Sequence, residues 1–154
     1  MPLRLVPLRE QDVPHAIQFL TEAQEWSPRT DFFTPPLVIL GKPDSVWLSA
    51  VNNEDFIGVV GFHAISWIDG VAEMFTSIAP KWRGTGMFAT LAKLQLDFGF
   101  LDLGLRKITC QCLAGSPTAK LADKLQIPLE GTFKHTRLKR GVYYDSLAYG
   151  LERV

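Results

Sequence analysis

The sequence has no run of about eighteen apolar residues, the length that a membrane-spanning helix needs. Its first residues, Met1 to Arg4, lack the charged start and apolar core of a secretory signal peptide. It also lacks an excess of charge of either sign, since 16 Lys and Arg balance 16 Asp and Glu. We therefore expect a cytoplasmic protein that binds no membrane and that no overall field draws toward nucleic acid.

Cysteine is scarce, and the two that occur, Cys110 and Cys112, are separated by one residue in a strand-like segment. This spacing places both side chains on one face of a strand, without the approach that a disulfide needs. A metal site would need further ligands at suitable spacing. The sequence predicts core or half-buried thiols and no metal.

The one dense run of positive charge extends from Lys134 to Arg140. Such a run is typical of the solvated face and turn of a hairpin. The alternative is a nucleic-acid contact, which predicts binding that weakens as salt rises. We favour the hairpin and expect no nucleic-acid partner.

Hydrophobic periodicity divides the 154 residues into the strands and helices of one domain, residues 1–154. Segments rich in β-branched and aromatic residues indicate strands at 3–8, 46–51, 56–66, 71–78, 107–113, 131–138 and 142–151. Apolar residues at helical spacing indicate helices after Asp12, which offers a cap, and at 36–40, 87–101 and 118–125. This order predicts one mixed sheet with helices on it.

The segment from Lys81 to Gly86 lies between an expected strand and the long helix. Free backbone N–H groups and the positive end of a helix can bind a diphosphate there. Gly84 and Gly86 would let the backbone approach the phosphate, while Arg83 and Lys81 add charged donors and Thr85 adds a hydroxyl. Taken alone, these glycines fit an ordinary tight turn equally well.

The spacing of this motif differs from both common nucleotide fingerprints. Ala89 occupies the third glycine position of G-x-G-x-x-G, and no lysine follows as in the P-loop. The motif also follows three antiparallel-looking strands instead of opening a first βαβ unit. We therefore do not expect a dinucleotide-binding fold.

From Phe56 to Glu152 the sequence resembles the GCN5-related N-acetyltransferase (GNAT) family, and within it the RimJ/RimL-type branch that acetylates the N-terminal amines of ribosomal proteins. The matching segments are Ala72-Glu73, Pro80–Gly86, Leu113–Ser116, Lys124-Leu125, Leu129–Phe133 and Tyr144-Asp145. The resemblance implies the GNAT fold of the α/β (α+β) class, a mixed, mostly antiparallel sheet of six to seven strands with helices on both faces. It also implies acetyl-coenzyme A (acetyl-CoA) as cosubstrate, without a metal.

The family's coenzyme motif, Q/R-x-x-G-x-G/A, is met here with lysine in its first place, which keeps the positive charge. The resemblance implies that the pantetheine arm pairs with the main chain near Ile78 and Ala79 as though it were another strand. The side chain of Ile78 could equally well be an ordinary core residue, because the implied contact uses only its main chain. The residues implied to contact the coenzyme are Ile78, Ala79, Lys81, Trp82, Arg83, Gly84, Thr85, Gly86, Met87, Ser116 and Lys120.

The sequence departs from the branch's pattern in two places. Ser116 stands where asparagine is usual, and Gln126-Ile127 stands where Gly-Phe is usual. The segment is also one residue shorter, which makes Thr118 the counterpart of a serine near the coenzyme thiol. These departures motivate an alternative function, a catalytically silent GNAT-fold binding or regulatory module.

Acyl transfer to an amine needs an unprotonated nitrogen, a polarised carbonyl and a stabilised leaving thiolate. The resemblance implies that Glu73 is the base or binds the amine, and a structural carboxylate is an equal alternative. Thr118 could hydrogen-bond the leaving sulfur, although we favour a helix cap, and both roles can coexist. Tyr144 or Tyr149 could donate a proton, but packed tyrosines with a bonded hydroxyl are more frequent. Asp145 follows the pattern of the branch, and it could equally well position a loop.

The expected acceptor is a primary amine, either a protein N-terminus or a small molecule, and it should enter between residues 26–36 and the closing hairpin. The residues expected to bind it are Trp26, Asp31, Phe32 and Phe33. A carboxylate among aromatic rings suits a cationic amine, although loop aromatics more often anchor their own loop. The oligomeric state stays open, with a homodimer as one possibility.

Overall fold

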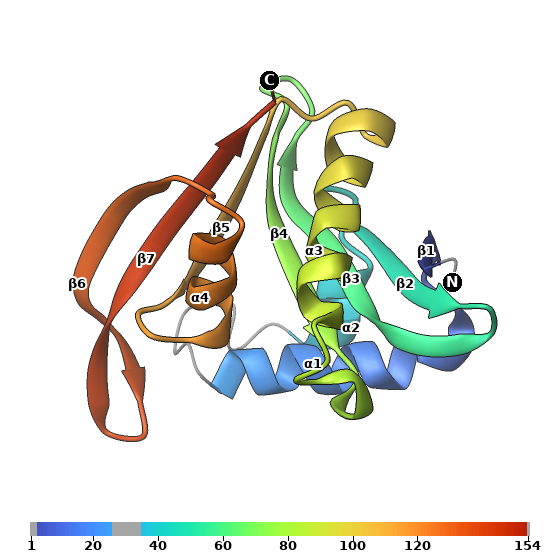
Figure 1. Ribbon diagram of the computed structural model, residues 1–154, viewed down its shortest axis with the longest axis horizontal. Helices are drawn as coiled ribbons and strands as arrows, with labels where there is room; N and C mark the ends of the chain where they lie inside the picture. The colour runs from blue at the N-terminus through green and yellow to red at the C-terminus, as the bar shows by residue number, and fades with distance from the viewer. Residues whose placement is uncertain (1–2, 26–34, 154) are drawn as a thin grey trace.

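A computed structural model of the chain describes residues 3–25 and 35–153, and its backbone forms a seven-stranded sheet in the order β1-β2-β3-β4-β5-β7-β6 (Figure 1). The strands are β1 (Leu3–Pro7), β2 (Val46–Asn52), β3 (Asp55–Ser66), β4 (Val71–Ile78), β5 (Lys107–Leu113), β6 (Leu129–Lys139) and β7 (Val142–Glu152). The helices are α1 (Val13–Glu25), α2 (Pro36–Leu40), α3 (Met87–Asp97) and α4 (Pro117–Lys124). In Figure 1, α3 and α4 cover the face toward the viewer, and α1 and α2 lie behind the sheet.

The expected fold class is confirmed, and each expected strand and helix is present close to its predicted bounds. One difference lies in the long helix, which was expected over residues 87–101. Its α-helical part ends at Asp97, and a π-helical turn, Phe98–Asp102, continues it. A second lies at the short helix, which begins at Pro117 because Ser116 caps it.

β4 and β5 form the sheet's parallel pair, and they are hydrogen-bonded over a short stretch. Val71 to Glu73 pair with Lys107 to Thr109, and beyond that point the strands diverge. β4 stays with β3 as far as Ile78, while β5 stays with β7 as far as Leu113. Figure 1 shows the resulting V between the two halves of the sheet. The backbone groups along the inner edges of this V are thus left without a strand partner.

The helix α3 is tied to the sheet by a buried polar side chain as well as by apolar packing. Gln95 is fully buried, and its amide donates to the carbonyl oxygens of Gly61 in β3 and Phe75 in β4, each at 3.0 Å. Its own carbonyl accepts from the Thr76 hydroxyl. Because buried polar groups are costly unless paired, this network fixes how α3 sits on β4.

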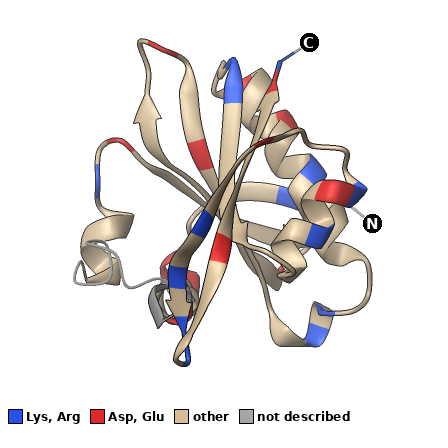
Figure 2. Cartoon of the chain, turned by 90° about the vertical axis from the view of Figure 1, so that its left-hand side faces the viewer, with Lys and Arg blue, Asp and Glu red and all other residues tan. Residues whose placement is uncertain are grey.

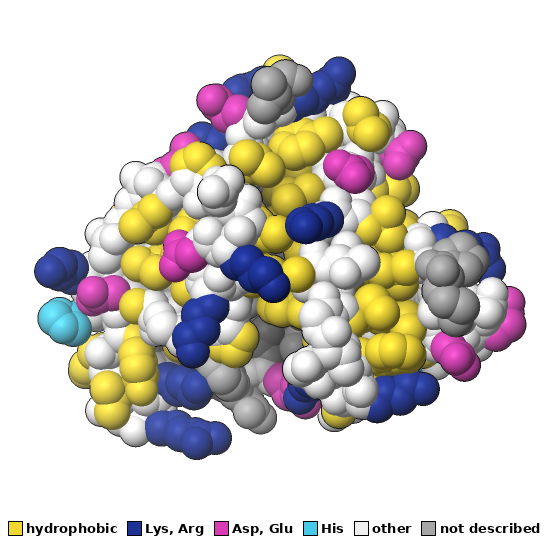
Figure 3. All heavy atoms as spheres, viewed as in Figure 1, with side chains coloured by type: hydrophobic (Ala, Val, Ile, Leu, Met, Phe, Trp, Pro, Cys, Tyr) yellow, Lys and Arg dark blue, Asp and Glu magenta, His cyan; other side chains and the backbone are white. Residues whose placement is uncertain are grey.

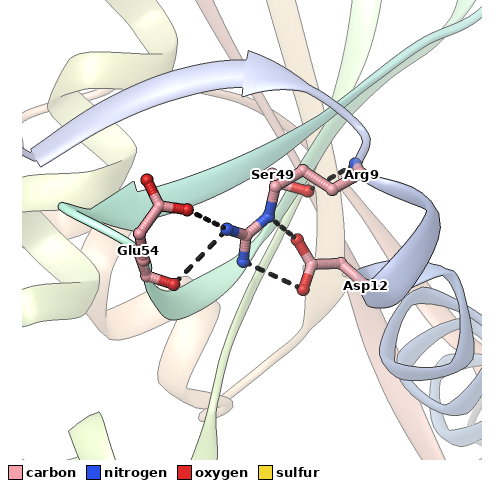
Figure 4. Close-up of polar contacts among 4 residues, drawn as sticks. All are labelled: Arg9, Asp12, Ser49 and Glu54. Carbon is pink, nitrogen blue, oxygen red and sulfur yellow. Dashed lines mark hydrogen bonds and ion pairs between the residues drawn. The ribbon is translucent and has the colours of Figure 1, made fainter.

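The start of α1 is fastened to the sheet by Arg9 (Figure 4). Its N–H donates to the Ser49 hydroxyl at 3.0 Å, and its guanidinium binds both carboxylate oxygens of Asp12. A further guanidinium N–H donates to the Glu54 carbonyl at 3.3 Å. Asp12, expected as a helix cap, is therefore engaged by Arg9, and this contact holds α1 against β2 and the β2–β3 turn.

Lys and Arg are interspersed with Asp and Glu over the chain, and several positive positions follow the hairpin of β6 and β7 (Figure 2). The basic run 134–140 forms the end of β6 and its turn, as expected. Not all of this run is exposed, since Arg137 is buried, with 8% exposed, and Lys139 is half-buried. None of the helices in the described parts of the chain is long and apolar enough to cross a membrane.

Candidate functional site

A cavity of about 580 Å³ occupies the V between β4 and β5. Its walls come from both strands, from α3 and α4 on one side of the sheet, and from α1 and β6 on the other. This position is a direct consequence of the short parallel pairing, because a fully paired β4 and β5 would leave no opening there.

Because successive side chains of a strand point to opposite faces of the sheet, alternation determines on which side of the cavity each side chain lies. On β4, Phe75 packs against the α1 cluster, whereas Met74 packs toward α3. On β5, Cys112 packs against α4, so Gln111 lies on the α1 side. The cavity therefore passes through the sheet, from an α3/α4 side to an α1 side.

The predicted phosphate-binding turn lies at the N-terminus of α3. Gly84 and Gly86 have φ angles of 75° and 84°, and a Cβ at either would meet nothing within 4 Å. The left-handed conformation, and not crowding by the protein, is what requires glycine. Among the described residues, none accepts a hydrogen bond from the N–H of Gly84, Thr85 or Gly86. The turn thus offers a row of free donors at a positive helix end, which fits a diphosphate.

Charged and apolar neighbours of this turn take different positions. Arg83 lines the cavity, and Lys81 is exposed, with its Nζ 5.4 Å from the centre of the Trp82 ring. The Trp82 ring and Met87 pack against the core beneath α3. Figure 3 shows Lys and Arg side chains around the hollow between α4 and α3 on this face. The α3/α4 side is therefore suited to an anionic ligand.

The main chain at the end of β4 faces the V at Ile78. The Ala79 N–H donates to Ile57 at 2.8 Å, and its carbonyl accepts from Trp82 at 2.9 Å. Because bonded and non-bonded pairs alternate in an antiparallel ladder, the N–H and C=O of Ile78 point away from β3. Ile78 is thus better placed than Ala79 to pair with an extended ligand, while its side chain is buried core.

The cap of α4 is supplied by Ser116 and not by Thr118. Ser116 is the N-cap of α4, since its hydroxyl accepts from the Ala119 N–H at 3.2 Å. The cap favoured for Thr118 was therefore wrong, because the helix begins one residue earlier than expected. Both residues line the cavity, and Lys120 is exposed on the same helix.

The departure at Gln126-Ile127 is accommodated by the fold. Gln126 has a φ of 58°, so it adopts the left-handed conformation for which glycine is usual. The Ile127 N–H donates to Ala122 at 2.9 Å, and its side chain packs between two core clusters. The two residues supply the turn and the apolar contact that end α4.

Cys110 and Cys112 are half-buried, as expected, and both line the cavity beside α4. The interaction between the two thiols, together with burial, raises the pKa of Cys110, and the same interaction lowers the pKa of Cys112. The neighbouring Ser116 hydroxyl also lowers the pKa of Cys112. Cys112 is therefore the thiol that ionises first. The sequence had indicated the shared face of these residues but not the cavity.

Glu73 lies where the pairing of β4 and β5 ends. Its Cα is paired with His63 in β3 and Thr109 in β5, and alternation places its side chain on the α1 side with Phe75. The side chain is partly buried. It stands at the closed end of the V and is not part of the cavity wall.

The two tyrosines of β7 lie on opposite faces. Tyr149 is 2% exposed, and its hydroxyl donates to the Asp123 carboxylate at 3.1 Å. Burial, together with this hydrogen bond, raises the pKa of Tyr149 to about 12. Tyr144 is 36% exposed, and Asp145 accepts from the His135 N–H at 2.9 Å, which positions β6. Tyr149 is therefore a packed residue whose hydroxyl is hydrogen-bonded, as is common for buried tyrosines.

The residues expected to bind the acceptor, Trp26, Asp31, Phe32 and Phe33, lie outside the described residues. Of the described residues, those that line the α1 side of the cavity are Phe19, Glu22, Phe75, Gln111 and Arg137. No group of three or more His, Cys, Asp or Glu in residues 3–25 and 35–153 is placed to hold a metal ion.

A family model for the acetyltransferase (GNAT) domain matches residues 2–120. The SPbeta prophage-derived uncharacterized N-acetyltransferase YokL of Bacillus subtilis is 21% identical over 147 residues, which are 95% of this chain and 78% of that protein. The uncharacterized N-acetyltransferase YoaA of the same organism is 25% identical over 101 residues, which are 65% of this chain and 57% of that protein.

Solved structures with the same fold include spermidine N-acetyltransferases of Vibrio cholerae. One, in complex with CoA and spermine, has a TM-score of 0.81 at 22% identity and covers 97% of this chain and 95% of its own. A mutant of the V. cholerae enzyme SpeG has a TM-score of 0.82 with the same identity and coverage. The relatives named here are uncharacterized N-acetyltransferases and spermidine N-acetyltransferases, so the comparisons support the family and not specifically the RimJ/RimL-type branch.

Proposed function

Since the chain belongs to the GNAT acetyltransferase family and is an acyltransferase, we propose that it transfers the acetyl group of acetyl-CoA to a primary amine by direct attack on the thioester. The observation that carries the proposal is the opening between β4 and β5 beside the free N–H groups of the Gly84–Gly86 turn. The acceptor is a small amine or a protein N-terminus of the kind that RimJ/RimL-type enzymes use.

The coenzyme would enter from the α3/α4 side. The N–H groups of Gly84, Thr85 and Gly86 and the guanidinium of Arg83 are suited to its diphosphate. The main chain of Ile78 is suited to its extended arm, because these groups point into the V. Bound there, the coenzyme supplies the activated acetyl group as a thioester.

The acceptor would enter from the α1 side, where Glu73 is available to take the proton from the attacking amine, directly or through a water. The new C–N bond forms as the C–S bond breaks, and the leaving thiolate takes up a proton. Thr118 is the hydroxyl of the cavity wall that we assign to the leaving sulfur, since Ser116 already supplies the cap of α4.

Thermal unfolding with and without acetyl-CoA is the first test, followed by mass spectrometry of a panel of amines and peptides. The panel includes spermidine and spermine, because solved relatives in the fold are spermidine acetyltransferases. We expect stabilisation by the coenzyme and an acetylated product. No stabilisation at millimolar coenzyme, together with no product, would refute the proposal.

Glu73→Gln tests the base. We expect this variant to bind the coenzyme like the wild type and to lose about 10²- to 10⁴-fold in rate, the usual contribution of a general base. Glu10→Gln, the same change at an exposed position, is the control and should leave the rate unaltered. If Glu73→Gln turns over at the wild-type rate, Glu73 is a structural carboxylate.

The second candidate function is a silent binding module, which Ser116 and Gln126-Ile127 motivated. Since both departures preserve the local structure, they give no reason for a lost activity. Coenzyme binding without any product across the whole panel is the result that would favour this alternative.

A further inference from the structure

Two thiols stand in the wall of the cavity on its α3/α4 side. Cys110 and Cys112 of β5 both line the cavity, together with Ser116 and Thr118 at the start of α4. Alternation places both cysteines on the face of the sheet that α4 covers, where Cys112 packs against that helix. Neither thiol takes part in the proposed acetyl transfer, although both border the space that the coenzyme would fill.

The register of the sheet puts Cys112 across the V from β4. Glu73 is paired with Thr109 at the end of the parallel stretch. Three residues further along each strand, Thr76 and Cys112 stand at the same level on the two sides of the opening, and both line it. The main chain of Ile78, which is suited to the extended arm of the coenzyme, lies two residues beyond Thr76. An arm that passes Ile78 on its way to Glu73 therefore runs between Thr76 and Cys112, and it carries a thiol at its end.

Cys112 is the more reactive of the two protein thiols. The interaction between them, together with burial, raises the pKa of Cys110, whereas the same interaction and the neighbouring Ser116 hydroxyl lower the pKa of Cys112. The thiolate, and not the thiol, is the nucleophile that peroxides oxidise. Cys112 is therefore the first of the two to be oxidised.

Cys110 is a poor partner for an oxidised Cys112. Residues two apart in a strand are separated by about 6.6 Å, and their Cβ atoms point in the same direction. A disulfide needs Cβ atoms about 3.5–4.5 Å apart, so a bridge would require β5 to deform. The strand is held over this stretch by β7, since Cys110 is paired with Tyr149 and Cys112 with Leu147. Because the chain has only two cysteines, the thiol best placed to react with an oxidised Cys112 is that of the coenzyme.

We propose that Cys112 is a modification site, at which CoA becomes joined to the protein through a mixed disulfide after a peroxide has oxidised the cysteine. The inference rests on the proposed coenzyme site and adds a redox-controlled block of that site. The joined coenzyme occupies the V and keeps acetyl-CoA out until a reductant releases it.

The chemistry needs a peroxide and CoA and no further reactant. The Cys112 thiolate attacks the peroxide, the O–O bond breaks, and the sulfur becomes a sulfenic acid while the released hydroxide takes up a proton to give water. The thiolate of CoA then attacks this sulfur, so that the S–S bond forms, the S–O bond breaks and a second water leaves. Together the two thiols lose two electrons, which reduce the peroxide. A dithiol reverses the modification by thiol–disulfide exchange.

Mass spectrometry of the intact protein tests the capture. The protein is treated with hydrogen peroxide, freed from it and exposed to CoA. We expect one CoA to be joined to each chain, at Cys112 in the peptide map, and to be released by dithiothreitol. A Cys110–Cys112 disulfide in place of this adduct, or an adduct on Cys110, would overturn the proposal.

Matched ligands show whether the coenzyme site directs the reaction. Desulfo-CoA, which lacks the thiol, should give no adduct. Pantetheine has the thiol but not the diphosphate, so it should need a concentration about 10- to 150-fold higher, the factor for loss of one charge-assisted hydrogen bond. If CoA and pantetheine react at equal concentrations, Cys112 behaves as an ordinary thiol and the proposal fails.

Matched variants on the same face of β5 assign the site. Cys112→Ser should form no adduct, whereas Cys110→Ser should form as much as the wild type. An adduct that persists in Cys112→Ser contradicts the assignment. If Cys112→Ser does not fold, the peptide map and the desulfo-CoA comparison on the wild-type protein decide.

A binding measurement keeps this inference distinct from the proposed activity. Calorimetry first measures the binding of CoA to the reduced protein. Binding that is followed by no adduct after peroxide refutes the modification site and leaves the proposed acetyl transfer intact, whereas absence of binding refutes the donor site and this inference with it. The adduct should raise Tm without free coenzyme present, and dithiothreitol should reverse the rise. An adduct that leaves Tm unchanged would place the coenzyme outside the V and overturn the proposal.

Discussion

Replacing Gly86 by alanine separates the conformational role of this turn from its role in binding. Gly86 has φ 84° and ψ −5°, and an added Cβ would meet nothing within 4 Å. The cost to folding is therefore the left-handed conformation alone, about 1–2 kcal/mol for an alanine. In a domain of this size that corresponds to a fall in Tm of about 2–8 °C.

The same substitution should cost more in coenzyme binding. The methyl group would stand in the open space before the free N–H groups, where a diphosphate must approach. Loss of one charge-assisted hydrogen bond, about 1.5–3 kcal/mol, weakens Kd by about 10- to 150-fold. Isothermal titration with CoA and thermal unfolding measure the two effects on the same sample.

Gly141 supplies the matched control. It lies in the turn between β6 and β7 with a φ of 78°, and a Cβ there also meets nothing within 4 Å. Gly141→Ala should lower Tm as much as Gly86→Ala and leave Kd unchanged. If the two variants bind CoA equally, the Lys81–Gly86 turn is not the diphosphate site and the reasoning fails.

Three further predictions concern buried side chains. Gln95→Leu should lower the free energy of unfolding by about 1–3 kcal/mol in urea titrations, because it leaves buried polar groups unpaired. An unchanged free energy of unfolding would contradict the role of Gln95 in holding α3 on β4. Cys112 should react with iodoacetamide before Cys110 and at lower pH than an ordinary thiol, and CoA should protect it; mass spectrometry that finds Cys110 modified first would refute this. Because folding raises the pKa of Tyr149 from 10.0 to about 12, its stabilising contribution is complete below pH 10 and is lost as pH rises toward 12. Tyr149→Phe should lack this loss in unfolding experiments at pH 9 and 11.5, and an identical profile would refute it.

The chemistry of the cavity depends on contacts between segments that are distant in the sequence. Gln95 connects α3, whose N-terminus carries the phosphate-binding turn, to the β4 strand that borders the V. The β4 edge and the turn are therefore held in one rigid arrangement. This explains why a glutamine is buried in a helix that is otherwise apolar on that side.

The sequence by itself determined most of the secondary structure and the donor side of the site. Strands and helices were predictable because apolar residues recur with periods near 2 and 3.6, which depend only on local backbone geometry. The Lys81–Gly86 turn was recognisable for the same reason, since its glycines, its charges and the helix that follows lie within one short segment. Such features need no knowledge of distant contacts.

The tertiary structure decided the cavity and its acceptor side. Nothing local in β4 or β5 specifies that their pairing stops at Glu73 and Thr109, because that depends on which neighbour each strand follows. Likewise, a run of exposed basic residues gave no sign that Arg137 is buried, because its direction is set by an irregular pairing of β6 with β7. Pairing register and strand divergence are long-range properties, and they determine which side chains meet in the V.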